Sequence, residues 1–450
     1  MRNLTQVTVS LAAAFAFNLS LPAAPVDSAE LQELRAQIHD LETKLLVLER
    51  RQEIQNERVA VTDKGVTLSS VDGANSIRFR GLAQLDSRLF FGDGGGIANN
   101  AFILRRARLI TEGQFAKNYG FQFVTEFGGS SVSILDANFT VAVDKALQFK
   151  FGKFKVPVGL ELLQSDSWTF FNERSIVTNL VPNRDLGVLA SGDILGGKLN
   201  YTAGIVGGVA DGASTTNSDF DNEKDIVGRL WASPFKDDAG SIVQGLSFGV
   251  SGSYGREKTT AGRTGGYRTD GQQTFFSYLA TTITDGPNWR VSPQLDYRSG
   301  SFGLQSEYVI STVNVRPSAT GKLTELQNKA WQVSAGYVLT GENSAYAGVV
   351  PASNFDLTKR TWGAFEVVGR YADLKIDHAA FPLYASATSN AHEAKSLGLG
   401  LNWYLSKAVR FTFDYYQTKF DRAPGAPATL TNAVIRQDEK SLITRFQVSF

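Results

Sequence analysis

The chain has 450 residues, including 43 glycines, 30 phenylalanines and three histidines but no cysteine, and its formal net charge is +1. The lack of cysteine excludes disulfides, thiolate-bound metals and thiol nucleophiles, and three scattered histidines are too few for a metal site or a catalytic triad. We therefore expect no metal, no cofactor and no enzymatic activity. The near-neutral charge gives no sign of a nucleic-acid partner, and abundant glycine and aromatic residues favour β-structure.

Residues 1–24 have the pattern of a secretory signal peptide. Arg2 precedes a short apolar stretch over residues 9–17, and small residues follow it. The alternative is a buried N-terminal helix, but the stretch is too short to remain as a membrane span. Export of a chain without cysteine favours a protein of the Gram-negative cell envelope.

Residues 30–58 carry a short heptad pattern with charged and amide side chains between its apolar positions. We predict a self-associating periplasmic coiled coil. The alternative is an amphipathic helix that packs on its own barrel or serves as a linker. The predicted oligomerisation positions are Leu31, Leu34, Ile38, Leu41, Leu45 and Leu48.

From residue 64 to residue 450, apolar and polar residues alternate with a period of two. In residues 397–405, for example, every odd-numbered residue is leucine or tryptophan, and the even-numbered ones are glycine, asparagine or tyrosine. The predicted strands are longer than the average strand of a soluble sandwich. Long strands joined alternately by short turns and long polar loops are typical of outer-membrane β-barrels, which are apolar outside and polar inside. We therefore predict an all-β, antiparallel transmembrane barrel.

The strand count follows from parity. Periodicity gives about seventeen segments, but the number must be even because both termini are expected on the periplasmic side. We predict sixteen strands, with one segment between residues 255 and 288 assigned to a loop; eighteen strands is the alternative. The connection over residues 341–359 then falls on the periplasmic side and is unusually long for a turn there. The predicted periplasmic turns are residues 116–118, 144–146, 300–301 and 406–407.

The final strand alternates to the last residue, Phe450. A terminal aromatic residue on such a strand is the assembly signal seen on outer-membrane barrels. We therefore expect the outer-membrane assembly machinery to recognise Phe450.

A barrel of sixteen to eighteen strands leaves a water-filled lumen, so function depends on the residues that line it. Residues 154–185 form a long external loop with apolar and aromatic stretches that an exposed loop would not need. We predict that this loop folds inward and narrows the pore.

Arginines occupy many predicted inward positions. Because guanidinium groups bind phosphate and carboxylate groups, such a lumen favours anions. The alternative is that these arginines pair with inward acidic residues and leave little selectivity. Alternation sends either Arg105 or Arg106 outward unless a β-bulge intervenes. The predicted anion-pathway residues on strands or in the loop are Arg78, Arg80, Arg88, Arg106, Arg108, Arg174, Arg184, Arg290, Arg298 and Arg370.

Several segments together resemble the phosphate-selective porin O and P family, over about residues 60–450. The segments are residues 64–86, 102–108, 151–157, 173–175, 362–366, 369–371, 401–404 and 445–450. The resemblance implies a sixteen-stranded trimeric outer-membrane channel for anions, with an arginine ladder that leads to lysines at the constriction. It places Arg105 and Arg106 in the ladder and Lys155 near the mouth of the inward loop. The chain departs from the family pattern because no lysine occurs between Val156 and Gly197. Either the central cationic constriction of the selective members is missing, or Arg174 and Arg184 supply its positive charge.

These predictions describe an outer-membrane porin for passive diffusion of small anions such as phosphate. Its expected partners are anionic solutes, outer-membrane lipid and lipopolysaccharide, and two further copies of the chain in a homotrimer. The alternative is a structural envelope protein whose helix tethers the outer membrane to a periplasmic partner.

Overall fold

The computed structural model describes residues 28–91, 98–217, 221–259, 266–427 and 438–450. The predicted signal peptide, residues 1–24, lies outside the described residues. The chain divides into two compact units, residues 1–57 and 58–450. The N-terminal unit contains one helix, and the C-terminal unit contains the strands.

Helix α1 runs from Ser28 to Arg58. Its six heptad positions are 43–64% exposed, although all are leucine or isoleucine. The charged side chains lie between them, and Lys44 pairs with Asp40 one turn away at 2.6 Å. None of the helices in the described part of the chain is long and apolar enough to cross a membrane.

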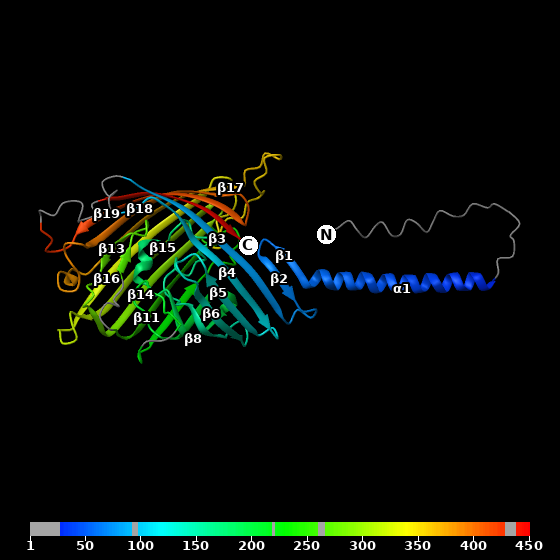
Figure 1. The fold of residues 1–450 in the computed structure, drawn as a ribbon, viewed down its shortest axis with the longest axis horizontal. Coiled ribbons are helices and arrows are strands. Elements are labelled where there is room, and N and C mark those ends of the chain that lie inside the picture. Colours follow the sequence, from blue (N-terminus) through cyan, green and yellow to red (C-terminus); the bar gives the residue numbers. More distant parts are fainter. Residues whose placement is uncertain (1–27, 92–97, 218–220, 260–265, 428–437) are drawn as a thin grey trace. The chain divides into compact units, whose positions relative to one another are not determined.

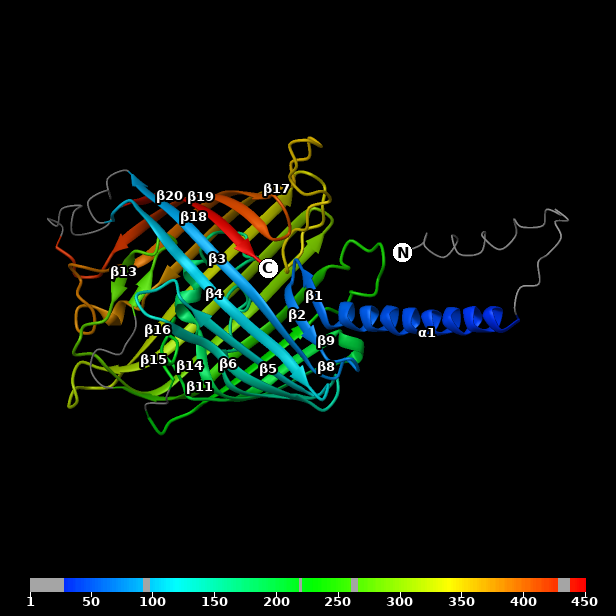
Figure 2. The same cartoon turned by 45° about the vertical axis from the view of Figure 1, so that its right-hand side comes forward.

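Sixteen strands of the described residues form a closed antiparallel barrel, as the sequence predicts (Figures 1 and 2). Each strand pairs with the next along the chain, and β20 pairs with β3 to close the wall. The strands are β3 (Ser76–Phe91), β4 (Ala101–Phe115), β5 (Tyr119–Glu126), β6 (Ser133–Ala142), β7 (Gln148–Lys155), β8 (Arg184–Ile194), β9 (Leu199–Val206), β10 (Asp225–Ala232), β11 (Leu246–Lys258), β14 (Ile283–Ser299), β15 (Phe302–Arg316), β16 (Thr324–Val338), β17 (Ala364–Lys375), β18 (Ala391–Tyr404), β19 (Val409–Arg422) and β20 (Asp438–Ser449).

Four further strands form two hairpins outside the sixteen-strand wall. Strands β12 (Gly266–Arg268) and β13 (Thr274–Ser277) pair only with each other and belong to the connection from β11 to β14. This is the segment that the parity argument assigns to a loop. Strands β1 (Val59–Thr62) and β2 (Gly65–Ser69) form the other hairpin, and β2 extends the sheet by pairing with the first residues of β3. The described residues also form three short 3₁₀ helices, η1 (Ile176–Leu180), η2 (Leu195–Gly197) and η3 (His378–Ala380).

The four predicted short turns each join two consecutive barrel strands. The connection from β16 to β17, residues 339–363, reaches the same end of the barrel. Its Ser344 amide donates to the carbonyl of Gly300 at 2.8 Å, and its Phe355 amide donates to the carbonyl of Leu405 at 2.7 Å. Both acceptors lie at or beside short turns, so we call this the turn end and the opposite rim the loop end.

The barrel wall reverses the polarity of a soluble protein. On β18, Leu397, Leu399 and Leu401 point outward and are 36–54% exposed, whereas the inward-facing Ser396 and Asn402 are buried. Soluble proteins place apolar side chains inside and charged ones outside. The reversed pattern requires an apolar medium around the wall, which a lipid bilayer provides.

The C-terminal residue completes the seam between β20 and β3. The Gly81 amide donates to the carbonyl of Phe450 at 2.8 Å, and the Phe450 amide donates to the carbonyl of Gly81 at 3.1 Å. A Cβ atom on Gly81 would lie 2.6 Å from the Phe450 ring, so glycine is required there for the ring to cover the backbone. The assembly role of Phe450 stays a prediction.

A charge on the outer face should destabilise the barrel. We expect Leu399→Arg to lower the free energy of unfolding by about 2–4 kcal/mol, because the guanidinium would lie in the hydrocarbon region. Unfolding in urea from lipid vesicles measures the change, with Leu399→Val as the control. An unchanged free energy in Leu399→Arg would contradict the lipid-facing assignment of this surface.

Candidate functional site in the lumen

The connection between β7 and β8, residues 156–183, lies inside the barrel. It is two residues shorter at each end than the predicted loop, because β7 continues to Lys155 and β8 begins at Arg184. Inward side chains of distant strands bind its backbone. The Leu160 amide donates to Glu307 at 2.7 Å, and the Asn172 amide donates to Asp414 at 2.6 Å. We call residues 156–183 the constriction loop.

Glu173 joins the constriction loop to the wall. Its carboxylate lies 2.6 Å from Arg105 Nε, 3.1 Å from Arg88 Nη2 and 2.9 Å from Arg445 Nη2. Burial opposes ionisation of Glu173, but the positive charges of Arg105, Arg445 and Arg106 outweigh burial and hold the pKa of its carboxyl well below the usual range. The carboxylate therefore stays ionised and supplies the negative charge that these wall arginines need.

A β-bulge explains how two adjacent arginines both reach the lumen. Gln84 of β3 pairs with Arg106, but the next residue, Leu85, pairs with Leu104. Arg105 is therefore the extra residue of the bulge. Arg105 binds Glu173 through both Nε and Nη2, while Arg106 donates to Gln84 at 2.7 Å. The sequence left this arrangement open.

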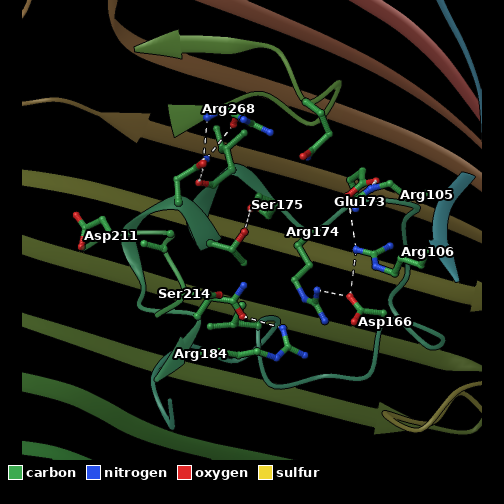
Figure 3. Close-up of a pocket in the computed structure, with 18 of the residues that line it drawn as sticks. Arg105, Arg106, Asp166, Glu173, Arg174, Ser175, Arg184, Asp211, Ser214 and Arg268 are labelled. Atoms are coloured by element: carbon green, nitrogen blue, oxygen red, sulfur yellow. Dashed lines mark hydrogen bonds and ion pairs between the residues drawn. The ribbon is translucent and has the colours of Figure 1, made fainter. Parts of the chain in front are cut away.

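Asp166 is the second buried carboxylate that the constriction loop brings to the wall. Its side chain pairs with Arg106 at 3.2 Å and contacts the guanidinium group of Arg174 (Figure 3). It also contacts the guanidinium group of Arg108. Burial opposes its ionisation, but Arg106, Arg174 and Arg108 hold the pKa of Asp166 well below its usual range. One carboxylate thus neutralises part of the charge of three arginines.

Two cavities lie on opposite sides of the constriction loop. The loop-end cavity has a volume of about 600 Å³ and includes Arg268 and Thr269 from the β12–β13 hairpin. The turn-end cavity has a volume of about 790 Å³ and includes Lys407 of a short turn and Phe450. Three residues line both cavities: Arg108, Asp166 and Arg184. We call the place where these three residues lie the narrow passage.

Basic side chains outnumber acidic ones around both cavities. Six arginines and four acidic residues line the loop-end cavity. Eight basic and three acidic side chains line the turn-end cavity, together with the C-terminal residue. The positive excess is therefore larger at the turn end.

The structure places eight of the twelve predicted anion-pathway residues around these cavities. They are Arg78, Arg80, Arg105, Arg106, Arg108, Lys155, Arg174 and Arg184. The other four line neither cavity and form ion pairs elsewhere. These are Arg88 with Asp86 and Glu173, Arg290 with Asp211, Arg298 with Asp296, and Arg370 with Glu161 and Asp270.

All eleven predicted arginines have a carboxylate within 3.5 Å. Arg78 and Arg80, for example, share Glu112 at 3.5 Å each, and Arg184 pairs with Asp136 at 3.1 Å. Lys155 instead donates to the backbone carbonyls of Leu162 and Gln164 at 2.7 and 2.9 Å. The inward arginines are thus paired with acidic residues, as the alternative from the sequence describes. Lys155 instead binds the backbone of the constriction loop.

Sequence reasoning missed a second inward segment. Tyr267 and Phe276 of the β12–β13 hairpin are buried and belong to one apolar cluster with Val158 of the constriction loop and Tyr384 of the β17–β18 connection. This cluster fills part of the lumen. The barrel strands that line the two cavities are β3–β8 and the last residue of β20, and the other lining residues come mainly from the constriction loop and from further connections at both ends of the barrel. The sequence does contain a sign of this inward position, because residues 274–278 form an aromatic-rich stretch within a predicted loop.

Comparison with known proteins assigns the family. The sequence model of the phosphate-selective porin O and P family matches residues 77–450. The chain belongs to this family. It is an outer-membrane porin, a channel-forming β-barrel. It is 24% identical to Porin O of Pseudomonas aeruginosa, over 87% of this chain and 92% of that protein.

Two solved structures share the fold at low sequence identity. The outer-membrane channel DcaP of Acinetobacter baumannii is 12% identical with a TM-score of 0.53, over 85% of this porin and 99% of that chain. The trimer form of OmpT of Vibrio cholerae is 11% identical with a TM-score of 0.51, over 84% and 100%. Within the residues that the structure describes, no cluster of three or more His, Cys, Asp or Glu side chains could hold a metal ion.

Loss of the Glu173 charge should loosen the constriction loop. Removal of one partner from a buried ion pair costs about 3–5 kcal/mol, and Arg105 has no other carboxylate within salt-bridge distance among the described residues. We expect Glu173→Gln to increase the flux of neutral sugars in a liposome-swelling assay. Glu325→Gln, at an exposed position of β16, is the control. Equal sugar flux in both variants would show that Glu173 does not anchor the loop.

Proposed function

We propose that this porin is a passive channel for small anions such as phosphate. The observation that carries the proposal is the excess of basic side chains around both cavities, which persists although the arginines are paired. Fixed positive charge raises the local concentration of anions in a narrow aqueous path. The likeness to Porin O and the phosphate-selective family supports the same class of solute.

The preference for anions should be moderate. At the narrow passage, Arg108 contacts the carboxylate of Asp166 and Arg184 pairs with Asp136, so the local positive excess is small. The larger excess lies in the turn-end cavity, where Lys150 of β7 forms no salt bridge among the described residues. This distribution supports attraction of anions by the cavities and weak discrimination at the passage.

The envelope-tethering alternative rests on helix α1 and its exposed heptad positions. A tether does not need a hydrated lumen. Two cavities that meet at charged residues on either side of a loop favour a channel, and a helix can serve oligomerisation in the same protein.

We further propose that the porin is a homotrimer, with helix α1 as a coiled coil in the periplasm. The exposed leucine and isoleucine stripe of α1 supports self-association, because an isolated helix gains stability when such a stripe is buried. One structural relative is described as a trimer.

Reversal potentials test the proposed function. In a planar bilayer under a potassium chloride gradient, we expect the potential to have the sign of anion preference. Arg108→Gln should lower the chloride-to-potassium permeability ratio by about twofold or more, because it removes a positive charge from the narrow passage. Arg229→Gln is the control, since Arg229 lines neither cavity and donates to Gln294 rather than to a carboxylate. Cation preference would contradict the anion assignment, and absence of conductance would contradict the channel.

The helix prediction needs a mass measurement on the full chain. We expect Leu34→Ser, Ile38→Ser and Leu41→Ser together to reduce the oligomer mass measured by light scattering in detergent. A matched triple variant on the opposite helix face, with serine at Gln32, Ala36 and His39, should retain the native mass. An unchanged mass in the first variant would place the oligomer contacts in the barrel instead.

A further inference from the structure

Asp166 differs from the other loop carboxylates in its position on the pathway. Glu173 lines only the loop-end cavity, and Glu161 lines neither cavity, whereas Asp166 lines both. Asp166 is therefore the one carboxylate of the constriction loop that both cavities share.

Three guanidinium groups converge on the Asp166 carboxylate. Arg106 and Arg108 extend from β4, and Arg174 comes from the constriction loop itself. The main chain is also fixed, since Gln84 Nε2 donates to the carbonyl of Asp166 at 3.1 Å. Guanidinium groups present paired donors to carboxylate and phosphate oxygens alike. This arrangement is the kind of site that would hold a permeating oxyanion if Asp166 did not occupy it.

We propose that Asp166 is a tethered competing anion that occupies the main oxyanion site of the passage and sets the selectivity of the pore. The inference rests on the proposed channel for anions and deepens it. With the carboxylate in place, a phosphate ion meets guanidiniums that are already partly neutralised, so it binds weakly and passes. Without the carboxylate, three guanidiniums would face the ion together, and phosphate would bind tightly.

A purely structural role for Asp166 is the competing explanation. However, the loop has several other attachments to the wall. Lys155 donates to two loop carbonyls, Glu307 and Asp414 accept from loop amides, and Glu173 binds three wall arginines. The loop should therefore keep its place when the Asp166 charge is removed, and the change should appear in ion selectivity rather than in pore size.

The test compares the native porin with Asp166→Asn and with the matched control Asp136→Asn. Asp136 also pairs with a lumenal arginine, but it lines only the turn-end cavity. Three quantities are measured: the chloride-to-potassium permeability ratio, the binding of inorganic phosphate to the detergent-solubilised porin by calorimetry, and the flux of neutral sugars into liposomes. We expect Asp166→Asn to raise the permeability ratio and to tighten phosphate binding about tenfold, with unchanged sugar flux. Asp136→Asn should change each quantity less, and Asp166→Glu should resemble the native porin.

The outcomes separate this inference from the proposed function. A raised sugar flux with an unchanged permeability ratio in Asp166→Asn would show that Asp166 only holds the constriction loop in place, and would overturn the inference. Equal phosphate binding in the native porin and Asp166→Asn would also overturn it. If the native porin conducts no current, the proposed channel fails, and the calorimetric comparison still decides whether Asp166 occupies an oxyanion site.

Discussion

Lipid acyl chains offer no hydrogen-bond partner, so every peptide group of a membrane-crossing strand must find its partner within the protein. Here β20 returns to β3, and the reciprocal bonds of Gly81 and Phe450 complete the seam. A closed wall then has one face toward lipid and one toward the lumen, and the period-two alternation assigns side chains to each. The buried charges and the exposed leucines of this porin both follow from this closure.

Closure confines many charged side chains to a narrow space. An unpaired buried charge is costly, so lumenal arginines require carboxylate partners. The constriction loop supplies two of them, Asp166 and Glu173, to arginines of β3, β4 and β20. The inward position of the loop therefore stabilises both the loop and the wall. The loop buries its apolar residues, and the wall arginines gain carboxylate partners.

The same pairing shapes the pathway. The apolar cluster around Tyr267, Phe276 and Val158 fills part of the lumen, and the barrel strands that line the cavities are mainly β3–β8. Ion selectivity in such a pore depends on the balance between basic and acidic side chains that line the two cavities. In our proposal, the cavities attract anions, and the Asp166 carboxylate keeps the passage from holding them.

The sequence alone predicted the barrel, its sixteen strands, the loop status of the segment that holds β12 and β13, and the family. These features depend on local patterns: a period of two, turn spacing and a terminal aromatic residue. The same patterns could not show that Arg105 and Arg106 both face the lumen, since that required a one-residue bulge opposite Gln84. They also could not show which carboxylate meets which arginine, because Asp166 and Arg108 lie 58 residues apart in the chain. Strand alternation depends on residues that are neighbours in the sequence. Ion pairing across the lumen depends on barrel closure and loop packing, which only the tertiary structure decides.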